Sequence, residues 1–297
     1  MFDVTIIGAG PAGISSALYA KRAGLNVLVL YYGESQLEKA HKIDNYYGFA
    51  DGITGKDLYA AGISQARNLE IEVKEEEVVD IQPSTEKSFC ITTSSAEYET
   101  TSIIIATGNK KLKPKISGLE EFESKGISYC AVCDGFFYRK KDVAVIGSKR
   151  YAFTEALHLA PIASSVTILT DGESADELEA LKKQSGSLGE KITIDTRKIA
   201  SITGAEKVDG VSFEQGDGIK ANGIFIAVGE AGGADFARKL GLEMEKDSIR
   251  TNDKMETNAK GIFAAGNVSG GLLQVCKAVY EGGVAGLSAV SYVRSMK

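Results

Sequence analysis

Two cysteines separated by two residues are the first feature of this sequence that could do chemistry. They stand in the run Cys130-Ala131-Val132-Cys133-Asp134-Gly135. A pair at this spacing cycles readily between dithiol and disulfide, and its surroundings can lower the pKa of one thiol. The carboxyl group of Asp134 adds a proton donor and acceptor beside the pair. The pattern therefore favours redox catalysis by Cys130, Cys133 and Asp134.

Half of a zinc site is the alternative interpretation of the two thiols. Such a site needs two further soft ligands. The chain has four cysteines and two histidines, and the remaining ones, Cys90, Cys276, His41 and His158, are isolated from one another. We therefore expect no metal. Cys90 falls in a strand pattern and Cys276 in an apolar helix, so we expect both to be small core residues.

A glycine-rich turn near the start of the chain is the second chemical signal. Gly8, Gly10 and Gly13 follow the apolar strand Phe2–Ile7 and open a helix expected over Pro11–Ala23. In this G-x-G-x-x-G pattern the glycines permit a tight turn and close approach of a pyrophosphate, while the helix N-terminus supplies amide donors. We therefore expect a dinucleotide here.

The remaining parts of a dinucleotide site are less complete. An acid that holds the ribose is expected at the end of the next strand, Val27–Leu30, but Tyr31, Tyr32 and Glu34 follow it. Two more buried strands end in small residues, at Ala106-Thr107-Gly108 and at Gly266-Asn267. Together with the first turn, in this order, they support a nucleotide-binding sheet.

The strand and helix pattern predicts two domains. The plan strand, glycine turn, helix and strand recurs from Val143, with a helix near Tyr151–Ala160 and a strand over Val166–Leu169. Between the two copies, segments at Ile71–Val73, Val78–Ile81 and Phe89–Thr93 are expected to form a small antiparallel insertion. We predict an α/β fold with two doubly wound Rossmann-like domains, the second inserted into the first. The first domain would span residues 1–112 and 233–297, and the second 113–232.

Composition excludes several classes of protein. Acidic residues outnumber basic ones by 40 to 34 in 297 residues, so the formal net charge is −6. We therefore expect no nucleic-acid partner. No apolar run approaches the ~18 residues of a membrane span, and Phe2–Ile7 is expected to be a strand and not a signal peptide. Few cysteines in a chain of this length indicate a cytoplasmic protein.

The ordered motifs resemble the low-molecular-weight thioredoxin reductases over essentially the whole chain. The resemblance implies an FAD-binding domain interrupted by a nucleotide-binding domain that carries the dithiol, in a homodimer. Cys133 would face the flavin, Cys130 would attack the disulfide of thioredoxin, and Asp134 would be the acid–base. The residues that would contact FAD by this resemblance are Gly8, Gly10, Pro11, Ala12, Gly13, Gln36, Asn45, Ala106, Thr107, Gly108, Asn267, Gln274 and Val275.

The chain departs from the family pattern in two places. Asn267 replaces the family's aspartate, and an amide can still hydrogen-bond a ribityl hydroxyl. In the inserted domain, Lys149 stands where the family has the second glycine of its turn, and Thr170-Asp171-Gly172 replaces the His-Arg-Arg run that holds the 2′-phosphate of NADPH. A side chain at the glycine and an aspartate at the phosphate both oppose NADPH.

This combination resembles the ferredoxin-dependent flavin thioredoxin reductases, which implies reduced ferredoxin as the electron donor. A flavin accepts electrons singly or in pairs, whereas nicotinamide delivers hydride. The alternatives are an NAD(P)H-dependent reductase with an unusual nucleotide site, a two-flavin disulfide oxidoreductase, and a non-catalytic flavin redox sensor. Because ferredoxins are usually acidic, the candidate docking residues are basic: Lys110, Lys111, Lys113, Lys115, Arg139, Lys140, Lys141, Lys149 and Arg150.

The same resemblance implies a movement of one domain against the other. A sulfur packed on the flavin cannot be reached by a protein substrate, so the domains are expected to reorient. The hinges would lie near Lys113–Gly118 and Gly229–Gly233.

Overall fold

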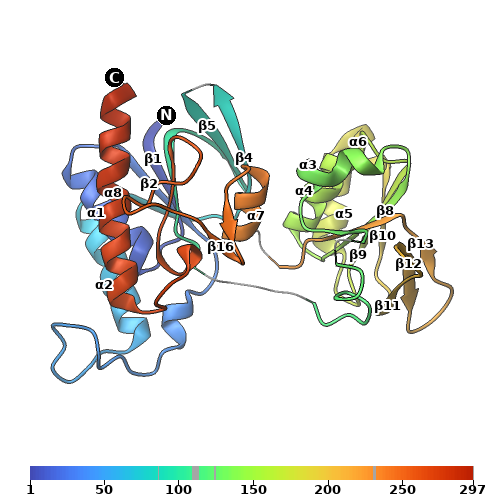
Figure 1. Cartoon of the computed structure of the whole chain (residues 1–297), viewed down its shortest axis with the longest axis horizontal. Coiled ribbons are helices and arrows are strands. Elements are labelled where there is room, and N and C mark those ends of the chain that lie inside the picture. Colours follow the sequence, from blue (N-terminus) through green and yellow to red (C-terminus); the bar gives the residue numbers. More distant parts are fainter. Residues whose placement is uncertain (86, 109–113, 124, 230–231, 297) are drawn as a thin grey trace. The chain divides into compact units, whose positions relative to one another are not determined.

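The chain folds into two compact units in a computed structural model that describes residues 1–85, 87–108, 114–123, 125–229 and 232–296 (Figure 1). Unit 1 comprises Met1–Lys110 and Gly232–Lys297, and unit 2 comprises Lys111–Ala231. The insertion of one doubly wound unit into another confirms the predicted fold class. The predicted boundaries at 112/113 and 232/233 and both hinge segments include or adjoin residues outside this description, so they stay predictions.

Unit 1 is built on a seven-stranded sheet in the order β3-β2-β1-β6-β5-β4, with β17 also beside β6. Strand β1 pairs in parallel with β2 and β6, and its apolar side chains are buried in the core as expected for a central parallel strand. The strands are β1 (Phe2–Ile7), β2 (Val27–Tyr31), β3 (Glu72–Glu75), β4 (Val78–Thr85), β5 (Ser88–Thr93), β6 (Glu97–Ile105) and β17 (Ile262–Ala264).

Helices α1 and α8 lie side by side on this sheet (Figure 1). The close approach depends on small residues, because a Cβ added to Gly282 would lie 2.2 Å from the carbonyl oxygen of Ala12. The helical segments of unit 1 are α1 (Pro11–Arg22), η1 (Gln36–Lys39), α2 (Gly55–Asn68), α7 (Gly233–Lys239), η3 (Gly266–Ser269) and α8 (Val275–Met296), and β15 (Met244–Glu245) pairs with β16 (Ser248–Ile249).

Unit 2 repeats the plan on a smaller scale. Its parallel sheet has the order β10-β9-β8-β14-β7, and a separate antiparallel sheet has the order β11-β12-β13. The strands are β7 (Ile127–Ser128), β8 (Asp142–Ile146), β9 (Ser165–Leu169), β10 (Ile192–Asp195), β11 (Ile199–Gly204), β12 (Val208–Phe213), β13 (Ile219–Lys220) and β14 (Gly223–Ile226). The helical segments are α3 (Ala131–Asp134), η2 (Gly135–Tyr138), α4 (Arg150–Leu159), α5 (Asp176–Gln184) and α6 (Gly186–Glu190).

One predicted strand belongs to a different part of the sheet. Ile71–Val73 was expected in an antiparallel insertion, but β3 pairs in parallel with β2 at the edge of the Rossmann sheet. The antiparallel part consists of β4, β5 and β6. The prediction for this segment was therefore wrong, because pairing direction depends on distant partners and not on local alternation.

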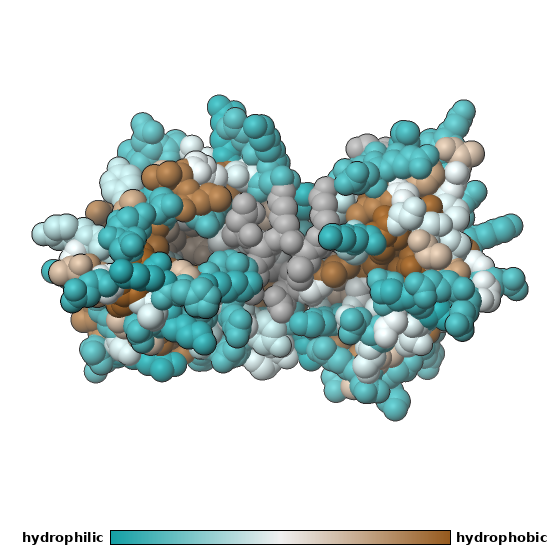
Figure 2. All heavy atoms as spheres, turned by 90° about the horizontal axis from the view of Figure 1, so that it is seen from below, coloured by the Kyte–Doolittle hydropathy of each residue, from teal (hydrophilic) through white to brown (hydrophobic). Residues whose placement is uncertain are grey.

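Hydrophilic side chains cover most of the face shown in Figure 2, and apolar side chains appear there as separate patches. Within the described residues, no helix is long and apolar enough to cross a membrane. The same residues contain no group of three His, Cys, Asp or Glu side chains that could hold a metal ion.

Candidate active site

Cys130 and Cys133 form a disulfide at the start of α3, with 5.4 Å between their Cα atoms. Cys130 is the N-cap residue of this short helix, and its Sγ accepts the backbone N–H of Cys133 at 3.1 Å. The two sulfur-bearing residues differ in accessibility, because Cys130 is only 2% exposed whereas Cys133 is exposed. The pair is therefore asymmetric.

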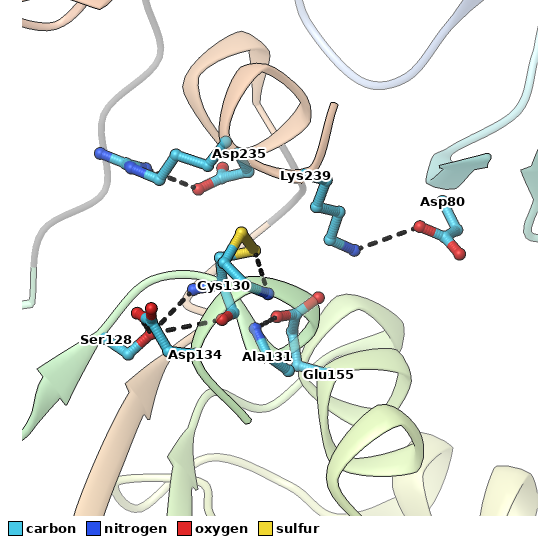
Figure 3. The surroundings of a disulfide bond; sticks show 10 residues. Asp80, Ser128, Cys130, Ala131, Asp134, Glu155, Asp235 and Lys239 are labelled. Atoms are coloured by element: carbon cyan, nitrogen blue, oxygen red, sulfur yellow. Dashed lines mark hydrogen bonds and ion pairs between the residues drawn. A yellow bond between two sulfur atoms is a disulfide. The ribbon is translucent and has the colours of Figure 1, made fainter. Parts of the chain in front are cut away.

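A serine from β7 links the disulfide to Asp134. Ser128 Oγ donates to Asp134 Oδ2 at 2.7 Å and accepts the backbone N–H of Cys130 at 3.1 Å (Figure 3). Burial, and then the nearby negative charge of Asp134, raise the pKa of Tyr138. The Asp134 carboxylate is thus held beside the pair by a neutral hydroxyl donor.

A second carboxylate approaches the pair from the neighbouring helix. Glu155 lies on the buried face of α4, and its Oε2 accepts the backbone N–H of Ala131 at 2.7 Å (Figure 3). No motif in the sequence indicated Glu155 or Ser128. An acid on the apolar face of the predicted helix was the available signal for Glu155.

The predicted FAD residues lie in unit 1, and several of them converge on the first turn. A Cβ added to Gly8 would lie 2.3 Å from the carbonyl oxygen of Ala106, and one added to Gly13 would lie 1.8 Å from that of Gly8. Gly10 instead faces open space, with Ser35 Oγ 3.9 Å from the position of an added Cβ. Among the residues that the structure describes, no side chain caps the N-terminus of α1. The turn therefore leaves room and amide donors for a phosphate, so these residues fit a dinucleotide.

Other residues of the expected FAD set flank this turn. Thr107 Oγ1 is buried without a hydrogen-bond partner among the described residues, which suits a polar ligand group. Asn45 Nδ2 donates to Gln274 Oε1 at 3.1 Å, which joins two of the predicted segments. The expected ribose contact remains without an acid at Tyr31, because Glu34 is exposed and Glu38 accepts the N–H of Ser35 in a capping box.

The loop that carries Asn267 is fixed by an ion pair on α8. Lys277 Nζ lies 2.9 Å from Glu281 Oε2 and donates to the carbonyl oxygens of Gly266, at 2.8 Å, and Gly270. Glu281 Oε2 accepts the N–H of Gly266 at 2.9 Å. The ion pair therefore binds both an amide group and a carbonyl oxygen at the start of η3. No motif in the sequence indicated this ion pair.

The corresponding turn of unit 2 carries different side chains. Gly147 keeps the close approach, since an added Cβ would lie 2.1 Å from the carbonyl oxygen of Ala227. Lys149 occupies the N-cap position of α4 in an extended conformation, and Tyr151 is buried. After β9, Asp171 accepts the N–H of Ile199 at 2.9 Å through Oδ1 and pairs with Lys198 at 3.1 Å through Oδ2.

Comparison with known proteins decides the family. The model of the pyridine nucleotide-disulphide oxidoreductase family matches residues 2–282. The chain belongs to this family.

Thioredoxin reductases are among the relatives of this chain. The protein of that name from Listeria innocua is 34% identical over 310 aligned positions, which cover 100% of this chain and 95% of the relative. The solved structure of the atypical thioredoxin reductase TRi from Desulfovibrio vulgaris Hildenborough is 38% identical, has a TM-score of 0.92 and is matched over 99% of each chain. A ferredoxin-flavin thioredoxin reductase from Clostridium acetobutylicum is 31% identical with a TM-score of 0.70, over 99% of this chain and 98% of that one.

These matches identify a thioredoxin-reductase-like flavoprotein disulfide reductase. FAD, the expected cofactor, is the cofactor of thioredoxin reductases in this family, which confirms that prediction. One prediction about the other cysteines was wrong: Cys276 is exposed in the first turn of α8, and Cys90 is half-buried. Cys276 lies off the stripe of small residues that packs on α1, so the apolar character of the helix did not imply burial.

Proposed function

We propose that this disulfide reductase reduces thioredoxin through FAD and the Cys130–Cys133 pair, with electrons from reduced ferredoxin and not from NADPH. The observation that carries the donor assignment is the turn of unit 2. Its fold-supporting Gly147 is retained, while the position that should admit a phosphate carries Lys149. A similar solved structure, a ferredoxin-flavin thioredoxin reductase, supports the same assignment.

The end of β9 adds a second argument against NADPH. Both carboxylate oxygens of Asp171 are engaged within unit 2, by the Ile199 amide and by Lys198. A 2′-phosphate placed there would meet a carboxylate whose countercharge is already in use. The carboxylate and the phosphate carry like charges, which repel each other. Asp171 therefore disfavours binding of the 2′-phosphate that distinguishes NADPH.

FAD, when bound, can take electrons singly and pass them on in pairs. Reduction of the Cys130–Cys133 disulfide to a thiol and a thiolate takes up two electrons and one proton. The reduced pair then passes the two electrons and the proton to the disulfide of thioredoxin, and its own sulfur–sulfur bond forms again. In this scheme Cys130 forms the mixed disulfide, Asp134 moves the proton, and Cys133 resolves the mixed disulfide.

The surroundings of the pair suit a protein substrate. Phe136 and Phe137 follow the pair in η2 and are 71% and 69% exposed, and Val132 between the cysteines is exposed as well. Exposed aromatic side chains of this kind mark interaction surfaces. We assign them to thioredoxin.

Basic residues of unit 2 are the proposed contacts of ferredoxin. Lys115, Arg139, Lys140, Lys141 and Lys149 are exposed, whereas Arg150 is half-buried and lies 3.7 Å from Glu177. Lys110, Lys111 and Lys113 lie outside the described residues. An acidic donor protein would be steered to the exposed group.

The decisive experiment is anaerobic mixing of the purified flavoprotein with NADPH, with NADH and with reduced ferredoxin, while the flavin absorbance is followed. We expect bleaching by reduced ferredoxin and none by NADPH. Rapid bleaching by NADPH would remove the proposed donor. Added thioredoxin should then be reduced only in the mixture that bleaches.

NADH is the second candidate donor, and one observation favours it. An aspartate just after the second strand of a Rossmann unit is the residue type that binds the ribose hydroxyls of NAD, and Asp171 stands there. Its hydrogen bonds to Ile199 and Lys198 argue against this use. The NADH arm of the same experiment decides between them.

We also propose a cytoplasmic homodimer that associates through unit 1. Tyr19, Tyr280 and Leu287 are exposed, and the Tyr19 ring approaches α8 at Gly283, whose added Cβ would lie 3.2 Å from it. Tyr280, Gly283 and Leu287 are three and four residues apart, so they share one face of α8. Light scattering should give a dimer that Leu287→Glu weakens, whereas Leu188→Glu in unit 2 leaves it intact.

A further inference from the structure

Glu155 is a buried carboxylate next to the disulfide that the scheme above does not use. Its exposed fraction is 1%, and its Oε2 accepts the N–H of Ala131 at 2.7 Å. That amide belongs to the peptide bond that joins Ala131 to Cys130. The carboxylate therefore lies one peptide group away from the less accessible sulfur of the pair (Figure 3).

The first turn of α3 directs two of its amide groups to oxygen atoms. Ser128 Oγ accepts the N–H of Cys130, and Glu155 accepts the N–H of Ala131. Amide groups at a helix start ordinarily stabilise a cysteine thiolate. Here the Cys130 sulfur accepts the N–H of Cys133, while the Ala131 amide is held by a carboxylate.

The environment of Cys130 thus disfavours negative charge in two ways. The sulfur is buried, and burial in an apolar setting opposes the thiolate. The carboxylates of Glu155, on α4, and Asp134, on α3, are held beside Cys130 by the Ala131 amide and the Ser128 hydroxyl, and like charges near a thiolate disfavour it. Cys133 is exposed to water and lacks the burial penalty.

We propose that Glu155 is a positioning residue whose charge, held next to Cys130 by the Ala131 amide, disfavours a thiolate at Cys130, so that the negative charge of the reduced pair resides on Cys133. This inference rests on the proposed function of the pair. It explains why attack by Cys130 needs Asp134: the proton of the Cys130 thiol must pass to a base before its sulfur can bond to a substrate sulfur.

The test is a redox titration of the holoenzyme in glutathione buffers at fixed pH, in a Cys90→Ser/Cys276→Ser background. Alkylation then reports only Cys130 and Cys133. Glu155→Gln keeps an oxygen acceptor for the Ala131 amide and removes the charge. We expect the equilibrium to move about tenfold toward the dithiol, which for two electrons is about 30 mV. An unchanged equilibrium, or a shift toward the disulfide, would overturn the inference.

Two further variants separate charge from packing. Glu177→Gln on α5 makes the same change in net charge beside Arg150, and we expect no shift from it. Glu155→Asp keeps the charge but shortens the side chain, so we expect an equilibrium nearer to the parent than that of Glu155→Gln. A shift of equal size in Glu177→Gln, or a larger one in Glu155→Asp than in Glu155→Gln, would contradict the proposed role.

The titration requires neither thioredoxin nor an electron donor. A pair that titrates without any effect of Glu155 but still reduces thioredoxin removes this inference and leaves the proposed function intact. If Glu155→Gln shifts the equilibrium of the pair but the enzyme reduces no thioredoxin with any donor, the proposed function is removed and the effect of Glu155 on the pair stands. A Glu155→Gln background should also reduce the loss of thioredoxin reduction caused by Asp134→Asn, since Cys130 would depend less on the base.

Discussion

The glycine turns of the two units share their backbone plan and differ in what they can admit. Gly8 donates its N–H to Leu30 and Gly147 donates to Leu169, in each case the last or next-to-last residue of the second strand. Both would collide with a strand carbonyl if they carried a Cβ, at 2.3 Å from Ala106 and 2.1 Å from Ala227. This first glycine serves the fold and is retained in both.

The second glycine position serves the ligand, and there the two units diverge. Gly10 faces open space in unit 1, whereas Lys149 stands at the same place in unit 2. The carboxyl ends of β9 and β10 are occupied by ion pairs, Asp171 with Lys198 and Asp195 with Arg197. On the proposed donor assignment, unit 2 keeps the doubly wound architecture without the residues that would hold a nucleotide.

The largest expected effect comes from removing either cysteine of the pair, which tests the proposed redox role of unit 2. Cys130→Ser and Cys133→Ser should each reduce thioredoxin turnover to background, because either change removes the disulfide. FAD should stay bound in both, since its predicted residues lie in unit 1. Cys130→Ser should show a long-wavelength absorption band from a thiolate at Cys133 beside oxidised flavin. The same band only in Cys133→Ser would reverse the roles of the two sulfurs.

The next-largest effect compares the residues at the third position of the two turns, Gly13 in unit 1 and Ala152 in unit 2. Gly13→Ala places a Cβ 1.8 Å from the Gly8 carbonyl oxygen, and we expect loss of FAD with destabilisation of about 1–3 kcal/mol. The matched change Ala152→Gly in α4 should cost about 1 kcal/mol and leave the flavin content unchanged. Flavin absorbance per protein and urea unfolding measure both. Equal flavin loss in the two variants would refute the assignment of FAD to unit 1.

A smaller effect concerns the residue that replaced the ligand-supporting glycine. Lys149→Glu should slow reduction by ferredoxin about threefold to tenfold at low salt, because it reverses a charge on the proposed docking surface. Lys220→Glu, at an exposed position of β13, is the control with the same charge change. If both variants slow the reaction equally, net charge and not a docking surface is responsible.

The smallest effect comes from the ion pair at the end of β10. Hydrogen bonds from Arg197 lower the pKa of Asp195. A depressed carboxyl pKa contributes stability above the pKa of the unfolded chain, near 4, and this stability is lost as the pH falls through the lower folded value. Asp195→Asn should therefore unfold at slightly less urea at pH 7, and the difference should shrink toward pH 3. A difference that grows in acid would contradict this sign.

Local patterns predicted the core of each unit and missed what depends on distant contacts. The strand, turn and helix from Phe2 to Arg22 could be predicted because alternation, glycine spacing and helix periodicity are all local. The parallel pairing of β3 could not, because it is determined by β2, some forty residues earlier in the chain. Cys276 was misplaced because helix periodicity does not reveal which face meets α1.

The same limit applies to the active site. The motif predicted Cys130, Cys133 and Asp134 as site residues because two thiols at this spacing, with a carboxyl beside them, are recognisable from local sequence. Ser128 and Glu155 reach the pair only through the packing of β7 and α4 on α3, and Lys277 reaches the Asn267 loop only through the fold of η3 on α8. Residues that position a reactive group form no motif of fixed spacing in the sequence, so they cannot be recognised from the sequence alone.

The contact between Gly233 and Thr107 has a consequence for how such a chain is assembled. An added Cβ on Gly233 would lie 2.7 Å from Thr107 Oγ1, so the strand that leaves unit 1 and the helix that re-enters it meet at one point. Insertions whose two ends are neighbours can be exchanged without redrawing their host. Because Thr107 and Gly233 are neighbours, a brief spacer in place of the segment between them would restore the chain path of unit 1.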